Sequence, residues 1–259
     1  MINYSDFTKP EDLKRLKYIV DVTNLKVPFK GRILDIGCGI GNICRQLGYY
    51  EYDLIGIDSD VKSIELAKSK NSKSNVKYFN VDVYQYLNDE KFFNAVICSE
   101  VLEHLIDPES IIKLAHKILR DDGVFVVTVP NGNGPRELFV TRPIIWIRDN
   151  SNILWKILSS IKIFLGYKGE TIHSKSENLE HLHFFTLKKL HLLADNNGFK
   201  MIDLRKSNFI SGVFPFSLVY KRSLKLQALD CWIADKLPNA FTSGFFTIWV
   251  KKNIYETTS

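Results

Sequence analysis

Glycines and an aspartate are spaced in this chain as in a binding site for a nucleoside. Glycine recurs at every second residue after a short apolar run, at Gly37, Gly39 and Gly41. Glycine permits a tight turn from a strand into a helix, where a ligand can lie against backbone N–H groups. Asp58 ends a second apolar run, and a carboxylate there can accept both hydroxyls of a ribose. These residues predict a nucleoside-cofactor site.

The glycine spacing favours a nucleoside with an amino-acid tail over a dinucleotide. In a dinucleotide fingerprint counted from Gly37, the third glycine would fall on Asn42. Asp35, just before the turn, could instead hold backbone amides or, directly or through water, a cationic amino-acid group. Such a ligand has no diphosphate to accommodate. An NAD-dependent oxidoreductase is therefore the less favoured interpretation.

Carboxylates and imidazoles form a second candidate site. Glu100, Glu103 and His104 are three and four residues apart, and such offsets share one face where a helix begins. His181 and His183 lie on a strand-like stretch whose alternation would point both to the same side.

Two carboxylates and two imidazoles could hold a divalent cation such as Mg²⁺. We expect His183 rather than His181 to join the site, which gives Glu100, Glu103, His104 and His183 as candidate metal ligands. Without a metal, His104 or His183 could act as a base, with Glu103 beside it. Both alternatives remain open at this stage.

Alternating strands and helices must position these residues. Apolar and β-branched runs predict strands at 33–36, 54–57, 76–80, 93–98, 123–129 and 245–250. Helical periodicity predicts helices over 12–22 and 109–119, and a third that Thr186 would cap. This alternation is typical of a doubly wound, mostly parallel α/β sheet with helices on both faces.

The motifs together resemble the class I S-adenosylmethionine-dependent methyltransferases. The resemblance rests on the glycine turn, on Asp58, on Asp82 after the third strand and on the segment 99–105 after the fourth. It implies a seven-stranded, Rossmann-like methyltransferase fold with an antiparallel last strand, and S-adenosylmethionine as cofactor. It also implies that Asp82 reads the adenine amino group, with Val83 against the ring. Further cofactor-site residues implied by the resemblance are Cys38, Ser59 and Ser99.

The spacing of residues 100–104 is similar to that of metal-dependent O-methyltransferases, among them the ubiquinone-biosynthesis and the small-RNA 2′-O-methylating types. In these the cation would bind the acceptor oxygens and lower a hydroxyl pKa. The resemblance therefore implies methyl transfer to a hydroxyl of a small-molecule, glycan or lipid-like acceptor. An RNA 2′-O-methyltransferase and a nucleoside-binding, non-catalytic relative are the alternatives.

Composition sets bounds on these interpretations. With 259 residues and 45% hydrophobic content, the chain suits a single domain over 1–259. Its formal charge of +6 is not gathered into one run, which suits anionic partners but disfavours a nucleic acid. Four cysteines show neither paired nor metal-ligand spacing, and the first residues show no secretion signal, so a cytoplasmic location is expected.

The insertion over 131–180 is predicted to cover the substrate as a lid. Its apolar part, 143–165, carries Lys156 and Lys162 and is too short to cross a bilayer. A helix there could pack on the domain, join two copies of the chain or lie in a membrane interface, and these alternatives leave the oligomeric state open. In the last case the protein would sit peripherally at the inner face of the membrane.

Overall fold

The structure is a computed structural model, and it describes residues 9–86, 93–164, 181–213, 215–220 and 222–252. Within helix α7 only the backbone is described for residues 158, 159 and 161–164.

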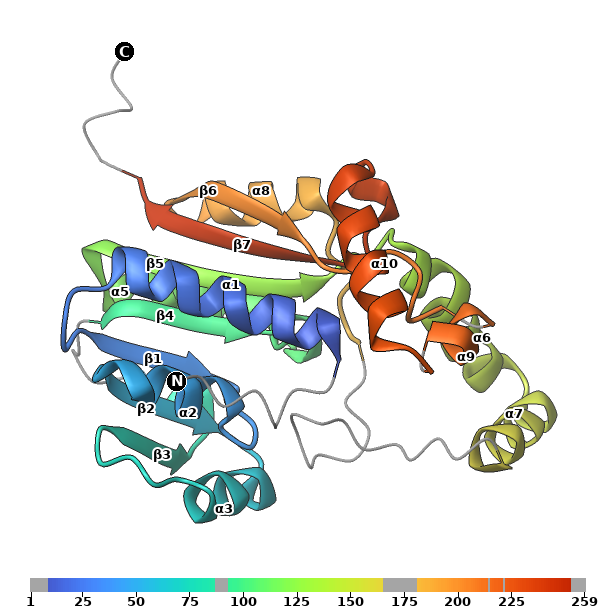
Figure 1. The fold of residues 1–259 in the computed structure, drawn as a ribbon, viewed down its shortest axis with the longest axis horizontal. Helices are drawn as coiled ribbons and strands as arrows, with labels where there is room; N and C mark the ends of the chain where they lie inside the picture. Colours follow the sequence, from blue (N-terminus) through green and yellow to red (C-terminus); the bar gives the residue numbers. More distant parts are fainter. Residues whose placement is uncertain (1–8, 87–92, 165–180, 214, 221, 253–259) are drawn as a thin grey trace.

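A seven-stranded sheet forms the centre of the molecule, in the order β3-β2-β1-β4-β5-β7-β6 (Figure 1). Its strands are β1 (Arg32–Ile36), β2 (Asp53–Asp58), β3 (Val76–Asn80), β4 (Phe93–Ser99), β5 (Leu119–Pro130), β6 (Phe199–Lys206) and β7 (Gly244–Lys251). The pairs from β3 to β5 are parallel, and β7 runs antiparallel to both β5 and β6. The predicted mostly parallel sheet with an antiparallel last strand is confirmed.

Helices cover both faces of the sheet. They are α1 (Pro10–Lys26), α2 (Asn42–Leu47), α3 (Val61–Ser69), α4 (Val83–Tyr86), α5 (Pro108–Ile118), α6 (Arg142–Asn150), α7 (Asn152–Phe164), α8 (Leu187–Asn196), α9 (Phe216–Tyr220) and α10 (Leu224–Lys236). Short turns add η2 (Gly48–Tyr50), η3 (Leu102–His104), η4 (Glu137–Thr141) and η5 (Asn239–Phe241). Side chains alternate across a strand, so Ile33 joins the core under α1, α2 and α3, whereas Leu34 joins the core under α5 and α8.

Local sequence accounts for the helix boundaries nearest the site. Asp107 and Thr186 accept hydrogen bonds from backbone N–H groups in the first turns of α5 and α8. The helix predicted over 109–119 ends at Ile118, because Leu119 already pairs with Phe93 as the first residue of β5. The exposed residues 120–122, which precede the strand predicted over 123–129, lie at an irregularity within β5.

The insertion after β5 lies beyond the carboxyl ends of the parallel strands. Helices α6 and α7, with α9 and α10, occupy the right-hand end in Figure 1, toward which the arrows of β1, β4 and β5 point. Over the part of the chain that the structure describes, no helix has the length and apolar character required to cross a membrane. Residues 165–180 of the predicted lid lie outside the described residues.

Candidate active site

A cavity of about 500 Å³ opens at the carboxyl ends of the parallel strands. Its lining comes from the segments that follow β1, β2, β3 and β4, and from the first turns of α1. Parallel strands bring the ends of segments far apart in the chain to one edge, where open α/β sheets bind ligands. The predicted site residues can therefore be placed one by one against this cavity.

The glycine turn forms one wall of the cavity. Gly37 and Gly39 line it, and Gly37 has a φ of +66°, a left-handed conformation that favours glycine. Gly41 lies outside the lining: it precedes α2 with a φ of +75°, and its carbonyl accepts a hydrogen bond of 3.2 Å from the Tyr78 hydroxyl. Two of the three glycines thus face the cavity, and Gly41 shapes the turn behind them.

Asp58 is held at the rim by the glycine turn itself. Its Oδ2 accepts a hydrogen bond of 2.8 Å from the Gly39 N–H, and its Oδ1 accepts one of 2.8 Å from the Asp60 N–H. Burial raises the pKa of Asp58, and these backbone hydrogen bonds partly offset the effect. Asp58 and the adjacent Ser59 both line the cavity. Each carboxylate oxygen retains acceptor capacity for a ligand hydroxyl.

Asp82 lies across the same cavity, after β3. Its Oδ1 accepts a hydrogen bond of 2.8 Å from the Tyr84 N–H, and Val83 lines the cavity beside it. The two aspartates that the sequence singled out therefore share one crevice with the glycine turn. Ser99, at the end of β4, completes this part of the lining.

Asp35 lies beneath the turn and not in the cavity wall. It belongs to β1, between β2 and β4, and it is almost fully buried. The Cys44 thiol donates a hydrogen bond of 3.2 Å to Asp35 Oδ2, and burial raises the pKa of this carboxyl to about 7. Cys38, by contrast, lines the cavity although most of it is buried. Asp35 thus supports the turn from below.

Glu100 joins the sheet to α1. Its φ of +58° is unusual for a residue other than glycine. Its Oε1 accepts a hydrogen bond of 2.9 Å from the Thr128 hydroxyl, and its Oε2 lies 3.4 Å from Arg15 Nη1. Arg15 also lies 2.8 Å from Asp12 Oδ1. Burial disfavours the Arg15 charge, but the surrounding carboxylates, Glu100 and Asp12 foremost, together outweigh it, so the pKa of Arg15 is raised.

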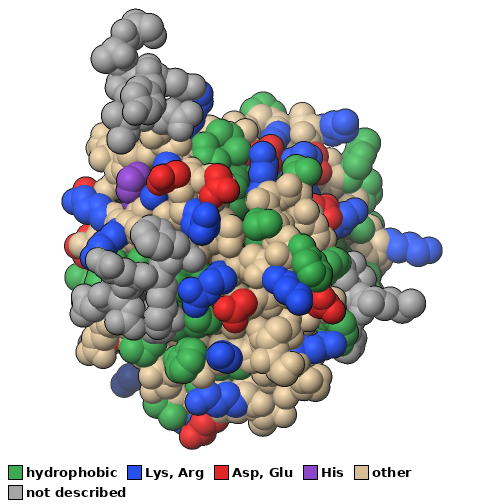
Figure 2. Space-filling view, turned by 90° about the vertical axis from the view of Figure 1, so that its left-hand side faces the viewer, with side chains coloured by type: hydrophobic (Ala, Val, Ile, Leu, Met, Phe, Trp, Pro, Cys, Tyr) green, Lys and Arg blue, Asp and Glu red, His purple; other side chains and the backbone are tan. Residues whose placement is uncertain are grey.

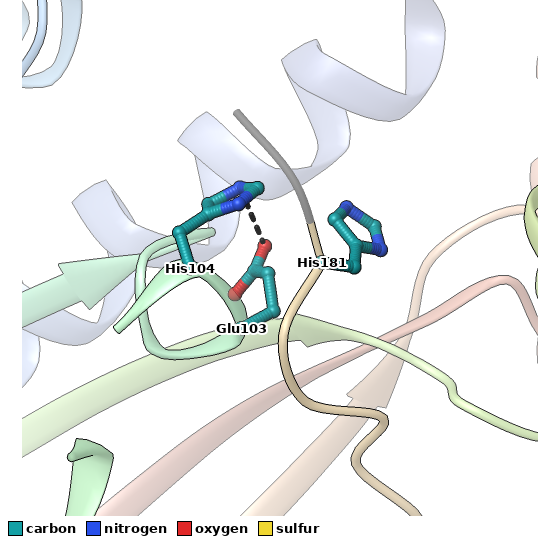
Figure 3. Close-up of side chains that lie close together, drawn as sticks. All are labelled: Glu103, His104 and His181. Carbon is teal, nitrogen blue, oxygen red and sulfur yellow. Dashed lines mark ion pairs between the residues drawn. The ribbon is translucent and has the colours of Figure 1, made fainter. Parts of the chain in front are cut away.

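Glu103, His104 and His181 lie close together in the lining of the cavity (Figure 3). Glu103 Oε1 lies 3.7 Å from His104 Nε2, and the two imidazole ring centroids are 5.1 Å apart. Each of the three residues offers one ligand atom, and these atoms lie within 4.8 Å of one another. Burial, reinforced by the Glu100 carboxylate, raises the pKa of Glu103 well above its usual range. The group combines a carboxyl that readily keeps a proton with two imidazoles.

The structure places the two predicted histidines, His181 and His183, in different surroundings. His181 lines the cavity, whereas His183 Nε2 lies 3.4 Å from the Ile106 carbonyl oxygen, away from the described lining. The predicted strand-like alternation fails here because the N–H groups of Leu182 and His183 both donate to the Glu103 carbonyl, at 2.8 and 3.1 Å. Consecutive residues therefore turn around one acceptor, and the two imidazoles do not share a side.

Several charged residues of the site were not predicted from the sequence. Arg15 and Asp12 reach the cavity from α1, and Arg136 reaches it from the insertion. A signal existed for Asp12, which shares a helix face with Leu16 at the i,i+4 offset, where a charged residue is unexpected. Glu137 lies behind His181 and carries no such local signal, because its neighbours in sequence give no clear periodicity.

Comparison with known proteins identifies the family. A family model described as a methyltransferase domain matches residues 14–204, and the chain belongs to this family. Ubiquinone biosynthesis O-methyltransferases from Pelagibacter ubique (strain HTCC1062) and Glaesserella parasuis serovar 5 (strain SH0165) are 30% and 32% identical to it, over 45% of this chain and 52% of each relative. The chain thus spans about half the length of these curated relatives.

A solved structure shows the same fold at low sequence identity. Magnesium protoporphyrin IX methyltransferase from Synechocystis PCC 6803, with bound SAH, matches with a TM-score of 0.55 and 12% identity, over 93% of this chain and 84% of that one. The predicted methyltransferase resemblance and Rossmann-like fold are confirmed.

Proposed function

We propose that this protein transfers the methyl group of S-adenosylmethionine to a hydroxyl of a small-molecule, glycan or lipid-like acceptor. One observation carries the proposal: Asp58 and Asp82 line a single cavity with the glycine turn, and Glu103, His104 and His181 line the same cavity. Methyl transfer to a hydroxyl requires a binding site for the cofactor and titratable side chains near the acceptor. The similarity to ubiquinone biosynthesis O-methyltransferases supports an oxygen acceptor.

Each part of the cavity lining would bind a different part of the cofactor. Gly37 and Gly39 would hold the methionine portion, Asp58 the ribose hydroxyls, and Asp82 with Val83 the adenine. Bound S-adenosylmethionine supplies an already activated methyl group on its sulfonium sulfur. The protein then contributes mainly by aligning the acceptor oxygen with that methyl group, since alignment alone can supply about 7–11 kcal/mol of a barrier.

An imidazole in the cavity would remove the acceptor's hydroxyl proton. His104 and His181 both line the cavity, and they are the candidates for this base. His183 is no longer favoured, because its ring nitrogen faces a backbone carbonyl. Glu103 would act beside His104, 3.7 Å from its Nε2.

A divalent cation such as Mg²⁺ remains part of the proposal, with a changed set of ligands. The buried Glu103 Oε2 has no hydrogen-bond partner among the described residues, and a cation could satisfy it. Glu100 is already engaged by Thr128 and Arg15, so Glu103, His104 and His181 are the residues that would hold the ion. A cation there would lower the pKa of the acceptor hydroxyl. Activity that survives exhaustive chelation would remove the cation from the proposal.

The insertion over 131–180 is proposed to help bind the methyl acceptor. Arg136 brings it to the cavity, and the exposed side chains of Trp146, Ile153 and Ile157 give α6 and α7 an apolar surface. That surface could cover a bulky acceptor or contact a membrane. Sedimentation with phospholipid vesicles separates these roles, because a lid alone would leave the protein in the supernatant.

A radiochemical assay tests the central proposal and its rivals. The protein is incubated with S-adenosyl-[methyl-³H]methionine and one acceptor at a time: a catechol, a polysaccharide, a lipid extract or small RNA. We expect label in one of the first three. RNA is disfavoured, because the excess of lysine and arginine is not gathered into one run of the sequence. The face in Figure 2, at the amino ends of the parallel strands and away from the cavity, likewise shows lysines and arginines interspersed with acidic side chains. Label in RNA alone would contradict the acceptor class, and cofactor binding without transfer to any acceptor would favour a non-catalytic relative.

A further inference from the structure

Glu137 is a buried acidic residue that the proposed chemistry does not yet use. It begins η4 in the insertion after β5, and its side chain is 1% exposed. Neither of its carboxylate oxygens has a hydrogen-bond partner among the described residues. Buried polar groups in proteins are almost always hydrogen-bonded, so such a carboxylate requires an explanation. It also lies behind the cavity lining, where it would touch neither cofactor nor acceptor.

The nearest ionisable partner of Glu137 is His181. Glu137 Oε2 lies 3.5 Å from His181 Nδ1. That separation exceeds a normal hydrogen bond, but hydrogen bonds in active sites are often long before the substrate binds. His181 is 20% exposed and lines the cavity on its other side. The imidazole is thus placed between a buried carboxylate and the acceptor end of the cavity.

Backbone contacts fix the two segments that carry this pair. Asn131 and Phe185 form a parallel β-bridge, and the Gly132 N–H donates a hydrogen bond of 2.7 Å to the Phe185 carbonyl. On the other side, the Leu182 N–H donates one of 2.8 Å to the Glu103 carbonyl. The chain around His181 is therefore tied both to the insertion that carries Glu137 and to the segment after β4. This arrangement positions the two side chains independently of any ligand.

From this geometry we infer that Glu137 is a positioning residue for His181. Its carboxylate accepts a hydrogen bond from Nδ1–H, which selects one imidazole tautomer and leaves the Nε2 lone pair for the cavity. In a neutral imidazole one nitrogen is a donor and the other an acceptor, and the partner of the first decides which is which. The inference rests on the proposed function for its kinetic consequence, since Nε2 is the atom that would face the acceptor. The same hydrogen bond would support His181 whether it acts as a base or as a metal ligand.

The described surroundings of His104 and His183 differ from those of His181. The carboxyl beside His104 is Glu103, which itself lines the cavity, and His183 faces the Ile106 carbonyl. Among the three imidazoles near the site, His181 alone has a described carboxylate placed behind it and outside the lining. We therefore expect His181 to respond to changes at residue 137 and the other two to remain unaffected.

The test combines nitrogen NMR with kinetics on the full chain. Two-bond ¹H–¹⁵N spectra of ¹⁵N-histidine-labelled protein report the tautomer of each imidazole. We expect the Nδ1–H tautomer for His181 in the unchanged protein and in Glu137→Gln, whose amide oxygen can still accept. We expect Glu137→Leu to shift His181 toward the Nε2–H tautomer. Supporting residues of this kind typically contribute 10- to 100-fold to activity, so kcat should fall by about that factor, with the affinity for S-adenosylhomocysteine unchanged.

Asp230→Asn is the matched control, because Asp230 is also a buried carboxylate. It accepts hydrogen bonds from the N–H groups of Phe209, Ile210 and Ser211, outside the cavity. This variant should lose stability and leave the His181 spectrum unchanged. If Glu137→Leu does not fold, Glu137→Asp carries the kinetic test: its carboxylate is one methylene shorter, so kcat should fall below that of Glu137→Gln. The unchanged protein's His181 tautomer and kcat in Glu137→Leu or, where that variant does not fold, equal kcat in Glu137→Asp and Glu137→Gln would overturn the inference. Absence of methyl transfer by the unchanged protein would refute the proposed function instead, and the spectra would still test the pair.

Discussion

Gly37→Ala tests whether the backbone of the cofactor turn is as constrained as its geometry indicates. At a φ of +66°, a Cβ on residue 37 would overlap Val101 Cγ2 and lie 3.2 Å from Cγ1 and 3.4 Å from Cβ. The left-handed conformation costs an alanine about 1–2 kcal/mol. Overpacking against Val101 adds about 1–3 kcal/mol. We therefore expect Gly37→Ala to lower the free energy of unfolding by about 2–5 kcal/mol, with loss of cofactor binding.

A second substitution separates these two costs. Val101→Ala removes both γ-carbons and leaves only the contact at 3.4 Å, which is ordinary van der Waals distance. In that background Gly37→Ala should cost only the conformational part, about 1–2 kcal/mol. The coupling energy between the two positions should then be about 1–3 kcal/mol.

Urea unfolding of the four proteins measures the cycle, and calorimetry with S-adenosylhomocysteine measures binding. Gly212→Ala is the control, since its φ is not left-handed and the nearest atom to a new Cβ would be Arg136 Cδ at 3.5 Å. It should leave both measurements unchanged. An equal cost of Gly37→Ala with and without the valine would refute the steric reasoning.

Two further predictions concern stability. The pKa of Asp35 is held near 7 by burial, so the folded protein keeps a proton that the unfolded chain loses, and this residue makes stability fall between about pH 4 and pH 7. This fall in the free energy of unfolding is on the order of 4 kcal/mol. In Asp35→Asn it should be absent from urea unfolding measured between pH 4 and pH 7. A variant with the same pH profile as the unchanged protein would contradict the raised pKa. Thr186→Ala removes the side chain that accepts a hydrogen bond of 3.2 Å from the Lys189 N–H, and should cost about 1 kcal/mol with kcat unchanged. Thr186→Ser should restore the loss, and a lowered kcat would show that the cap does more than hold α8.

The central strands were predictable because their apolar residues are contiguous, as expected for strands buried on both faces. β6 (Phe199–Lys206) was not predicted, because charged residues such as Lys200, Asp203 and Arg205 interrupt it. It tolerates them as an edge strand with β7 as its one neighbour. A search for contiguous apolar residues therefore misses a polar strand at the edge of a sheet.

Some residues of the candidate site could be predicted from the sequence, and others could not. Asp58 ends β2 and Asp82 lies two residues after β3, so the parallel topology brings both to one rim. The family resemblance indicated Asp82, and the strand pattern indicated Asp58. The choice between His181 and His183 depended on the local path of the chain around the Glu103 carbonyl, which no periodicity encodes. Arg15 and Glu137 reach the site through packing between segments distant in sequence. Such contacts become visible only once the helices are placed.

Calorimetric titration with S-adenosylhomocysteine tests the central claim most directly, by comparing the unchanged protein with Asp58→Ala. The control is Asp53→Ala, at the opposite end of β2, where the carboxylate pairs with Arg32 at 3.1 Å. We predict that the unchanged protein and the control bind the nucleoside with the same affinity, and that Asp58→Ala abolishes binding. Undiminished affinity in a folded Asp58→Ala protein would contradict the assignment of this cavity as the cofactor site.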